Sequence, residues 1–293
     1  MSALELAQPA AIQTAEVSGF VYGMSYDDYA KVDALNGSKI VNMRRSPKYY
    51  RHMIDNPPAE SDAMFLGTVT HRAILEPETV GKIAVWGTED WMKTRNGKKW
   101  DEWAKSATDE GALILTVKEY EGVLNMTTGV LNNEPIRKYA HAEGPTEVCM
   151  FWRDRGRKYK ARLDKLIPAT HTIFDLKTTR DCHSWKFGSQ AYALGYHIKM
   201  ALYARGYAAI MGRTPVCRIG AIDSKAPYES AVYRMTPDVL QQGVDEMVAL
   251  VKLIDECEES GNWPGEYDEE TDLFLPAWTQ YSESPADETN DAV

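Results

Sequence analysis

The chain of 293 residues is 44% hydrophobic and 26% charged, which is typical of a globular protein with one large or two small domains. It has no run of 18 apolar residues and no basic segment followed by an apolar N-terminal core, so we expect a cytoplasmic protein without a membrane span or secretory signal. The net charge of −10 opposes a polyanionic partner, but the acids gather after residue 254 and the basic clusters lie between residues 93 and 205.

The domain organisation follows from composition. Residues 1–18 show no hydrophobic period and predict a flexible N-terminus, and residues 281–293 predict an acidic disordered tail. We expect residues 19–280 to form a single domain. The four cysteines are far apart and form no C-x-x-C pair, which argues against a zinc site or an iron–sulfur cluster and favours reduced thiols.

The first predicted elements are helices. Ser25 is a suitable N-cap for one short helix, and either Asn36 or Ser38 for a second. Apolar side chains at the spacing of a covered helix predict a buried helix at residues 65–75, where Gly67 permits close packing. His71 lies in this helix and is, from the residues alone, either a satisfied core group or a ligand.

Residues 80–118 have the most unusual composition. Four tryptophans alternate there with five basic side chains, namely Trp86, Trp91, Trp100 and Trp103 with Lys93, Arg95, Lys98, Lys99 and Lys105. Aromatic rings can stack on splayed bases while basic groups pair with phosphates, so this segment is a candidate grip on a DNA end or single strand. The alternative is an amphipathic helix near residues 100–105 with a purely structural role.

The second half of the chain predicts alternating strands and helices. We expect a helical segment at 117–139 with an end near residues 132–135, a strand at 145–152 and a turn at 153–157. A helix at 189–206, strands at 216–222 and 230–235, and a helix from Pro237 to about Cys257 with Thr236 as its N-cap follow. In the strand at 145–152, Glu147 shares one face with Cys149 and Phe151. In the helix at 189–206, one stripe is formed by Tyr192, Tyr196, Lys199 and Tyr203.

The most informative segment is residues 158–179, which read as two strands joined at 167–170. Alternation places Asp175 and Lys177 on one face of the second strand. Asp164 precedes Asp175 by eleven positions, and a connecting loop with an even number of residues puts both carboxylates on the same face. Loops of two or four residues fit, so the two carboxylates can converge.

Two carboxylates on one face repel each other unless a cation lies between them. All-oxygen ligands with an open side suit Mg²⁺ or Mn²⁺, which can polarise a phosphoryl oxygen and lower the pKa of a bound water. Lys177 is then placed to orient that water or to neutralise charge on the phosphorus centre. The alternative is an exposed hairpin with solvated charges, because D-x-K triplets are common.

Asp164 followed by Asp175-Leu176-Lys177 resembles the metal-binding core of the PD-(D/E)XK nucleases, and within that superfamily the chain resembles the RecE (exonuclease VIII) nuclease domain of phages and prophages. The likeness runs in order over most of the chain, through residues 25–29, 46–50, 67–78, 162–164, 196–203, 226–229 and 263–264. It implies an α/β fold with a central mixed sheet flanked by helices and an N-terminal helical portion.

The resemblance also implies roles for individual residues. Asp164, Asp175 and the carbonyl of Leu176 would hold the metal, with His71 as a further ligand. Catalytic roles would fall to Asp164, Asp175, Lys177 and, as an acid on the preceding strand, Glu147. Candidate DNA contacts are Arg162, Thr178, Tyr196, Lys199 and Tyr203; Lys199 stands where the family usually has glutamine, which puts any glutamine-dependent contact in doubt.

The implied activity is that of a Mg²⁺-dependent exonuclease that degrades linear duplex DNA 5′ to 3′ and leaves 3′ overhangs for phage-type recombination. The implied partners are duplex DNA ends, further copies of the chain in a ring and a single-strand annealing protein. Two alternatives stay open: a single-strand or structure-specific nuclease of the same superfamily, and a DNA-binding module without activity.

Overall fold

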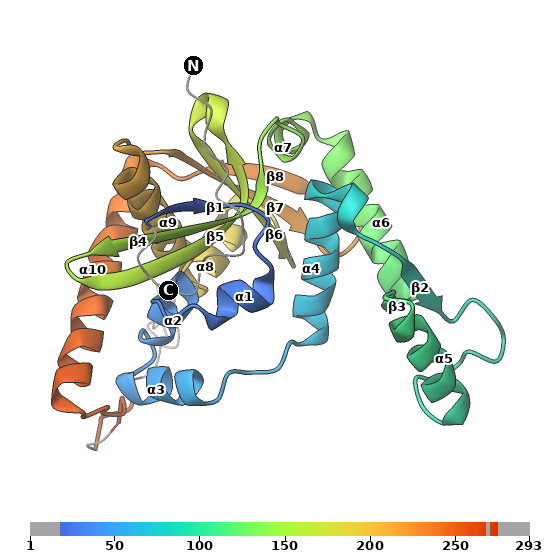
Figure 1. Ribbon diagram of the computed structural model, residues 1–293, viewed down its shortest axis with the longest axis horizontal. Coiled ribbons are helices and arrows are strands. Elements are labelled where there is room, and N and C mark those ends of the chain that lie inside the picture. Colours follow the sequence, from blue (N-terminus) through green and yellow to red (C-terminus); the bar gives the residue numbers. More distant parts are fainter. Residues whose placement is uncertain (1–17, 268–269, 275–293) are drawn as a thin grey trace, which may run out of the picture.

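A six-stranded sheet organises the structure, a computed structural model that describes residues 18–267 and 270–274 (Figure 1). The strand order is β1-β4-β5-β6-β7-β8; β6 and β7 are parallel, and every other neighbouring pair is antiparallel. The predicted mixed sheet is therefore confirmed. The strands are β1 (Gly19–Val21), β4 (Thr146–Asp154), β5 (Arg157–Ile167), β6 (Thr172–Thr179), β7 (Val216–Asp223) and β8 (Ser230–Arg234).

Local turn chemistry explains how β4 leads into β5. The turn consists of Arg155 and Gly156, both with positive φ (49° and 83°). Two residues of this conformation match the right-handed twist of a hairpin, so the pairing continues from Asp154–Arg157 inward. The edge strand β1 was not predicted, because three residues are too few to show alternation.

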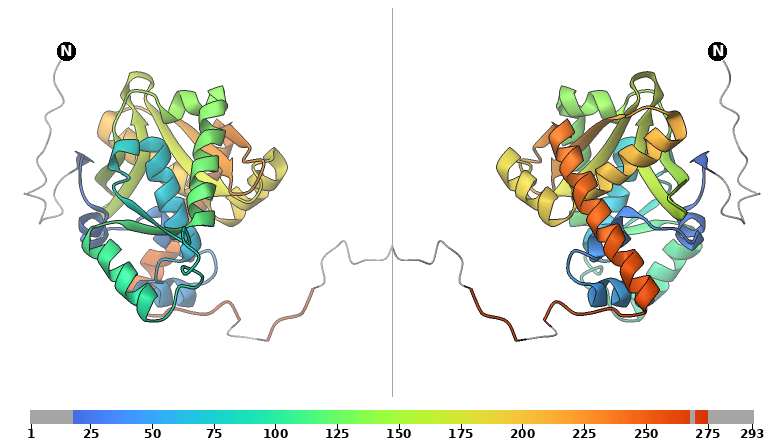
Figure 2. Two further views of the ribbon diagram at one scale, coloured as in Figure 1. Left: turned by 90° about the vertical axis from the view of Figure 1, so that its right-hand side faces the viewer. Right: turned by 90° about the vertical axis from the view of Figure 1, so that its left-hand side faces the viewer.

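Helices cover both faces of the sheet (Figures 1 and 2). On one face α9 (Tyr196–Met211) packs against β4, β5 and β7, and α10 (Pro237–Ser260) packs behind α9. On the other face lie α4 (Asp62–Leu75), α6 (Val117–Asn132) and α7 (Glu134–Ala140). Alternation along β6 sends Ile173 into the first core and Phe174 with Leu176 into the second.

The N-terminal helices begin where the sequence predicts. They are α1 (Tyr26–Lys31), α2 (Gly37–Asn42) and α3 (Pro47–Asp55). The Ser25 side chain accepts from the Asp28 N–H and caps α1, and Asn36, not Ser38, caps α2. Tyr50 of α3 stacks on Trp263 with ring centroids 5.5 Å apart, which ties the segment after α10 to this end of the molecule.

The single helix predicted at 189–206 is wrong, because this segment forms two helices. Tyr192 therefore does not share a helix face with Tyr196, Lys199 and Tyr203 as predicted. α8 (Ser184–Ala193) ends before Gly195, whose φ of +64° is left-handed, and α9 starts at Tyr196. A Cβ on Gly195 would lie 2.6 Å from Val41, so only glycine fits this break. Tyr192 therefore belongs to α8, whereas Lys199 and Tyr203 lie on α9.

In the helical segment predicted at 117–139, the helix end expected near residues 132–135 is confirmed: α6 ends at Asn132, and a second helix, α7, begins at Glu134. Asn133 between them has an extended backbone, and its side-chain amide donates to the Ser230 carbonyl. Proline at the second position of α7 lacks an N–H and favours a fresh helix start there.

Residues 83–116 form an arm that projects beside the sheet, at the right of Figure 1. It consists of β2 (Ile83–Trp86), α5 (Lys98–Asp109) and β3 (Leu113–Thr116), with β2 and β3 paired in parallel. The helix near residues 100–105 is confirmed, but the two-strand pairing was not predicted. Its base is a cluster in which Leu115 packs with Val69 of α4 and Val123 of α6.

In the described part of the chain, none of the helices has the length and apolar character needed to cross a membrane. All four cysteines are buried and unpaired, as predicted from their spacing. The predicted flexible N-terminus, apart from Ser18, and the predicted acidic tail lie outside the described residues, so those boundaries stay predictions.

Candidate metal centre

The two central carboxylates converge as the hairpin spacing predicts. The connection between β5 and β6 is four residues long, and the pairing Lys165–Phe174 places Asp164 opposite Asp175 when the register is continued by one residue. There the ladder of backbone bonds stops. The Asp164 carboxylate instead accepts the backbone N–H of Leu176 through Oδ2 at 2.8 Å, which holds the side chain against the second strand.

Lys177 lies among the oxygen atoms that the sequence assigns to a cation. Its Nζ is 2.6 Å from Asp175 Oδ2, 3.0 Å from the Leu176 carbonyl oxygen and 3.6 Å from Asp164 Oδ2. Two carboxylates and a carbonyl thus surround one positive charge, so these oxygen atoms suit a hard divalent cation. The predicted group of Asp164, Asp175, Leu176 and Lys177 is brought together.

His71 reaches the same group from α4. Its Nδ1 is 3.5 Å from Asp164 Oδ2, and its side chain is 20% exposed. Burial and the neighbouring Lys177 charge lower the pKa of the imidazole to about 4. The ring is therefore neutral at pH 7 and has a lone pair to offer a cation, which is the form that metal-ligating histidines take.

The buried charges of the group control one another. Burial raises the pKa of the Asp175 carboxyl, as does Asp164, whereas Lys177 opposes the rise. Burial alone would lower the pKa of Lys177, but Asp164 and Asp175 outweigh it and raise that pKa, so the lysine stays charged.

Glu147 lies next to this group on β4, opposite Asp164 in the strand register, but it has a partner of its own. The Arg162 Nε is 2.6 Å from Glu147 Oε2, so two residues predicted for separate roles form an ion pair. The Arg162 guanidinium also lies over the Tyr26 ring, 5.6 Å from its centroid. Burial and the Asp164 charge raise the pKa of Glu147 to about 7, while Arg162 opposes the rise.

The α9 helix supplies the remaining wall. The ammonium groups of Lys177 and Lys199 each lie 5.8 Å from the centroid of the Tyr196 ring. Burial, then Lys177, lowers the pKa of Lys199. Burial, then Asp175, raises the pKa of Tyr203 far above its ordinary value. Three of the five predicted DNA contacts therefore share the surroundings of Asp175.

Thr178 lies where α4 crosses β6. A Cβ added to Gly67 would be 3.6 Å from the Thr178 hydroxyl, which is ordinary contact distance, so the close packing predicted for Gly67 does not require glycine. Two further residues contact the strands of the site. Gln190 of α8 accepts from the Thr179 hydroxyl at 2.8 Å, and Glu76, which follows α4, accepts from the Thr146 hydroxyl. Gln190 was not predicted as a site residue, because no motif marks it.

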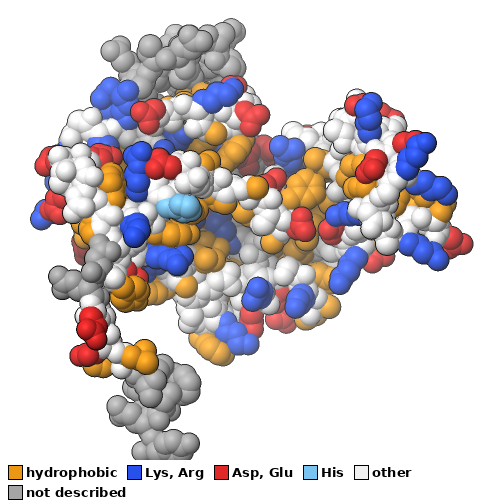
Figure 3. Space-filling view, turned by 90° about the horizontal axis from the view of Figure 1, so that it is seen from below, with side chains coloured by type: hydrophobic (Ala, Val, Ile, Leu, Met, Phe, Trp, Pro, Cys, Tyr) orange, Lys and Arg blue, Asp and Glu red, His pale blue; other side chains and the backbone are white. Residues whose placement is uncertain are grey.

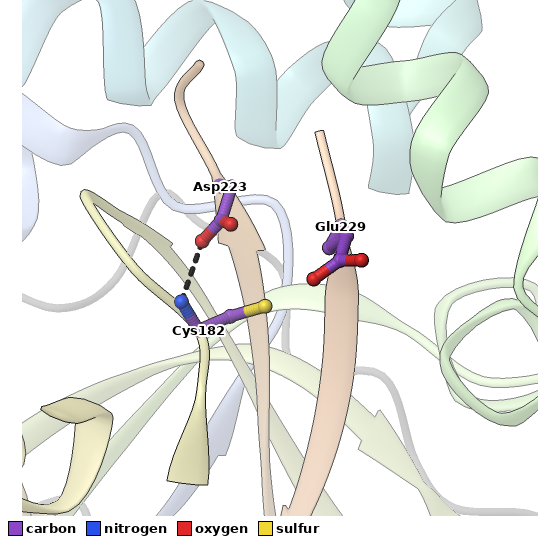
Figure 4. Close-up of side chains that lie close together, drawn as sticks. All are labelled: Cys182, Asp223 and Glu229. Carbon is purple, nitrogen blue, oxygen red and sulfur yellow. Dashed lines mark hydrogen bonds between the residues drawn. The ribbon is translucent and has the colours of Figure 1, made fainter. Parts of the chain in front are cut away.

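A second cluster of possible metal ligands lies elsewhere in the structure (Figure 4). The ligand atoms of Cys182, Asp223 and Glu229 lie within 4.8 Å of one another, and the Cys182 N–H donates to Asp223 Oδ1 at 2.5 Å. Burial, together with the two acids, raises the pKa of the Cys182 thiol to about 12. Without a cation the thiol is protonated at neutral pH, so a cation that bound here would have to displace this proton.

Comparisons with known proteins show the family of the chain. Residues 37–273 match the family described as "PDDEXK-like domain of unknown function (DUF3799)". A solved structure from Eubacterium rectale, which bears the provisional name of an exonuclease, is 14% identical with a TM-score of 0.60 and covers 86% of this chain and 96% of its own. A phage-related exonuclease from Haemophilus somnus 129PT is 11% identical with a TM-score of 0.34, covering 78% and 96% respectively. A search of curated proteins finds no match.

Proposed function

Because the chain belongs to the PDDEXK-like family and has the fold of PD-(D/E)XK nucleases, we propose that it is a metal-dependent exodeoxyribonuclease acting on linear duplex DNA. The observation that carries the proposal is the convergence of Asp164, Asp175 and the Leu176 carbonyl around the Lys177 ammonium. The names of the two structural neighbours, both exonucleases, support the same reaction class.

In the proposed reaction, one set of residues binds the metal ion and Lys177 acts on the phosphate or the water. Asp164, Asp175, the Leu176 carbonyl and the neutral His71 would hold Mg²⁺ or Mn²⁺, which when bound polarises a phosphodiester and lowers the pKa of a water molecule. The Lys177 ammonium carries three donors, so it would donate to the phosphate oxygen that gains charge or orient the attacking water.

The walls of the site would position the DNA. Lys199 and Arg162 supply positive charge. A phosphate that binds near Lys199 would offset the repulsion between the ammonium groups of Lys199 and Lys177. Tyr196 and Tyr203 offer hydroxyl groups on the α9 side of the site, and Thr178 offers one on the α4 side. Lysine at the position where glutamine is usual would exchange an amide contact for a charged one, which increases the salt dependence of binding.

The direct test is digestion of linear duplex DNA labelled separately at the 5′ and 3′ ends, with Mg²⁺ and with EDTA. We expect rapid Mg²⁺-dependent release of the 5′ label from linear DNA and none from closed circles. Internal cutting of circles would favour an endonuclease, loss of single strands alone would favour the single-strand nuclease, and binding without digestion would favour the inactive module.

Asp175→Ala should reduce cleavage by at least about a thousandfold, because it removes one metal ligand and the carboxylate nearest to the Lys177 ammonium. DNA binding and the fold should be largely retained. Asp238→Asn, which changes an exposed carboxylate at the start of α10, is the matched control and should cleave like the parent chain. Mg²⁺-dependent cleavage retained in Asp175→Ala would contradict the proposed site.

The cellular task extends this proposal. We propose that resection leaves 3′ overhangs for phage-type recombination, that several copies form a ring around DNA, and that an annealing protein receives the product strand. The support is the ordered resemblance of the sequence to RecE-like nucleases. Sedimentation velocity of the purified chain tests the ring, because a monomer at all concentrations would contradict it.

A further inference from the structure

The arm carries an open pocket separate from the candidate metal centre. Its volume is about 500 Å³, and its lining residues are Trp91, Lys99, Glu102 and Trp103. This volume lies within the range of pockets that bind small ligands. Trp91 is 42% exposed, although large aromatic side chains are usually covered unless they contact a partner.

A cluster of indole rings supports the pocket from behind. Trp86 is 4% exposed and meets Trp91 and Trp103 edge-on, with centroids 5.5 and 5.0 Å apart. Within the described residues, the buried Trp86 Nε1 has no hydrogen-bond acceptor. Buried donors are nearly always paired, so an indole donor is left over directly behind two pocket-lining rings. The rings are held by one another, which gives a rigid aromatic surface.

The pocket carries charges of both signs, because Glu102 lines it beside Lys99 and the Trp91 Nε1–H donates to the Glu89 carboxylate at 2.6 Å. Glu102 is 3.7 Å from Lys98, which offsets its charge, whereas Lys99 forms no ion pair in the part of the chain that the structure describes. Its ammonium lies 5.7 Å from the centroid of the Trp91 ring. A cationic ligand such as a methylated amine would be repelled by this lysine, while an anion next to an aromatic ring system would be attracted. Figure 3 shows basic side chains spread over the arm beside hydrophobic surface.

The arm is attached to the helix that carries His71. Leu115 of β3 packs with Val69, two residues before His71 in α4, and with Val123 of α6. Arg95 in the loop before α5 also pairs with Glu119 of α6 at 2.6 Å. Both contacts fix the pocket to the nuclease body, so an occupant of the pocket is held by the same framework as the metal centre.

We propose that this pocket binds an unpaired nucleotide of single-stranded DNA. A base stacks on Trp91 and Trp103 while Lys99 pairs with a neighbouring phosphate, the combination that sequence-tolerant single-strand binding uses. Base faces are accessible only where the strand is unpaired, so intact duplex does not fill the pocket. The choice of DNA rests on the proposed function, in which an uncut strand is released from the duplex.

The test measures binding of fluorescently labelled oligothymidine by anisotropy in EDTA, where metal-dependent cleavage cannot occur. Trp91→Ala and, separately, Lys99→Glu should each weaken binding about tenfold. Trp185→Ala is the matched control, because Trp185 is also exposed and has Lys186 over its ring at 5.4 Å; it should change affinity less than twofold. Circular dichroism of each variant verifies the fold. Because Trp91→Ala and Lys99→Glu change different chemistry, a loss of binding in both variants is not explained by one local folding defect.

Unchanged affinity in both pocket variants, or equal losses in Trp185→Ala, would overturn the proposal, as would failure of the parent chain to bind the oligonucleotide. A pocket that binds a polypeptide instead gives the first of these results. The nuclease proposal is judged separately by digestion with Mg²⁺. If the parent chain cleaves DNA but Trp91→Ala binds the oligonucleotide as well as the parent chain does, only the pocket proposal is refuted. If Trp91→Ala loses oligonucleotide binding but the parent chain cleaves no DNA, only the nuclease proposal is refuted.

Discussion

At the scale of residues, two lysines on neighbouring strands show how the contacts of a side chain decide its role. Lys160 of β5 is 2% exposed, and its ammonium donates to three backbone carbonyls at the end of α1. Those carbonyls need a donor, so this lysine completes a helix end. Lys177 of β6 instead contacts carboxylates that a metal would share. The first is structural and the second is available for chemistry.

Glu147 gives a pH-dependent prediction at this scale. Its pKa is about 7 in the folded chain and near its ordinary 4.5 when unfolded, so the folded state binds the proton more tightly. The free energy of unfolding therefore falls as pH rises from about 4.5 to 7 and levels off above that range. Glu147→Gln removes this contribution. Because the side chain is 31% exposed, the difference between parent and variant should change by only about 1–2 kcal/mol across the window.

Urea unfolding in EDTA at several pH values measures this difference. His71, with its pKa lowered to about 4, acts in the opposite sense, since the folded state resists its protonation. Subtracting the curve of the variant removes the His71 contribution. A difference that stays constant between pH 5 and 8, or that moves in favour of the parent chain as pH rises, would show that the pKa of Glu147 is not raised.

At the scale of elements, the break between α8 and α9 decides which side chains face the metal centre. Continuous helix through Gly195 would carry the stripe of Tyr192 onward, but the left-handed glycine starts α9 on a new axis. Tyr192 then stacks on His197, which bonds Glu246 of α10 at 2.8 Å. The residues after the break, including Lys199 and Tyr203, are left to line the site.

Gly195→Ala should destabilise the chain by about 2–4 kcal/mol, because alanine disfavours a φ of +64° and its Cβ would lie 2.6 Å from Val41. Gly188→Ala is the matched control. Gly188 lies within α8 with no atom near the added Cβ, so alanine there should be neutral or stabilising by up to about 1 kcal/mol. Urea midpoints compare the two; equal midpoints would mean that Gly195 can be replaced without strain.

At the scale of the whole molecule, the candidate metal centre joins the sheet to the helices on both of its faces. Asp164 and Asp175 come from the sheet, whereas His71 comes from α4 on one face and Lys199 from α9 on the other. A cation held by ligands from the sheet and from α4 links their stabilities. A cation bound there would therefore stabilise the whole fold, whether or not the chain is catalytically active.

Mg²⁺ or Mn²⁺ should raise the thermal midpoint of the parent chain relative to EDTA. At a hundred times the dissociation constant the stabilisation is about 2.7 kcal/mol, because the folded state alone presents the assembled ligands. Asp164→Ala should lose most of this increase, and Asp238→Asn should keep it. Differential scanning calorimetry provides the measurement. A midpoint that rises equally in Asp164→Ala would place the stabilising cation elsewhere, for example at the Cys182 cluster.

Much of the site was predictable because it is local. Strand alternation and the even loop between β5 and β6 placed Asp164, Asp175 and Lys177 on one face, and side-chain caps placed the starts of α1, α2 and α10. These features depend on backbone geometry over a few residues, so they are visible in the sequence itself.

Only the tertiary structure decided which distant segments meet. The pairing of β2 with β3 spans an intervening helix, the Glu147–Arg162 ion pair joins two strands, and the meeting of His71 with Asp164 depends on how α4 packs against the sheet. Such contacts form when apolar faces are buried against one another. Hydrophobic periodicity predicts that a face is buried, but it does not predict which element covers it. The candidate metal ligands of the β5–β6 hairpin were therefore predictable from the sequence, whereas the walls of the site and the fold of the tryptophan arm required the tertiary structure.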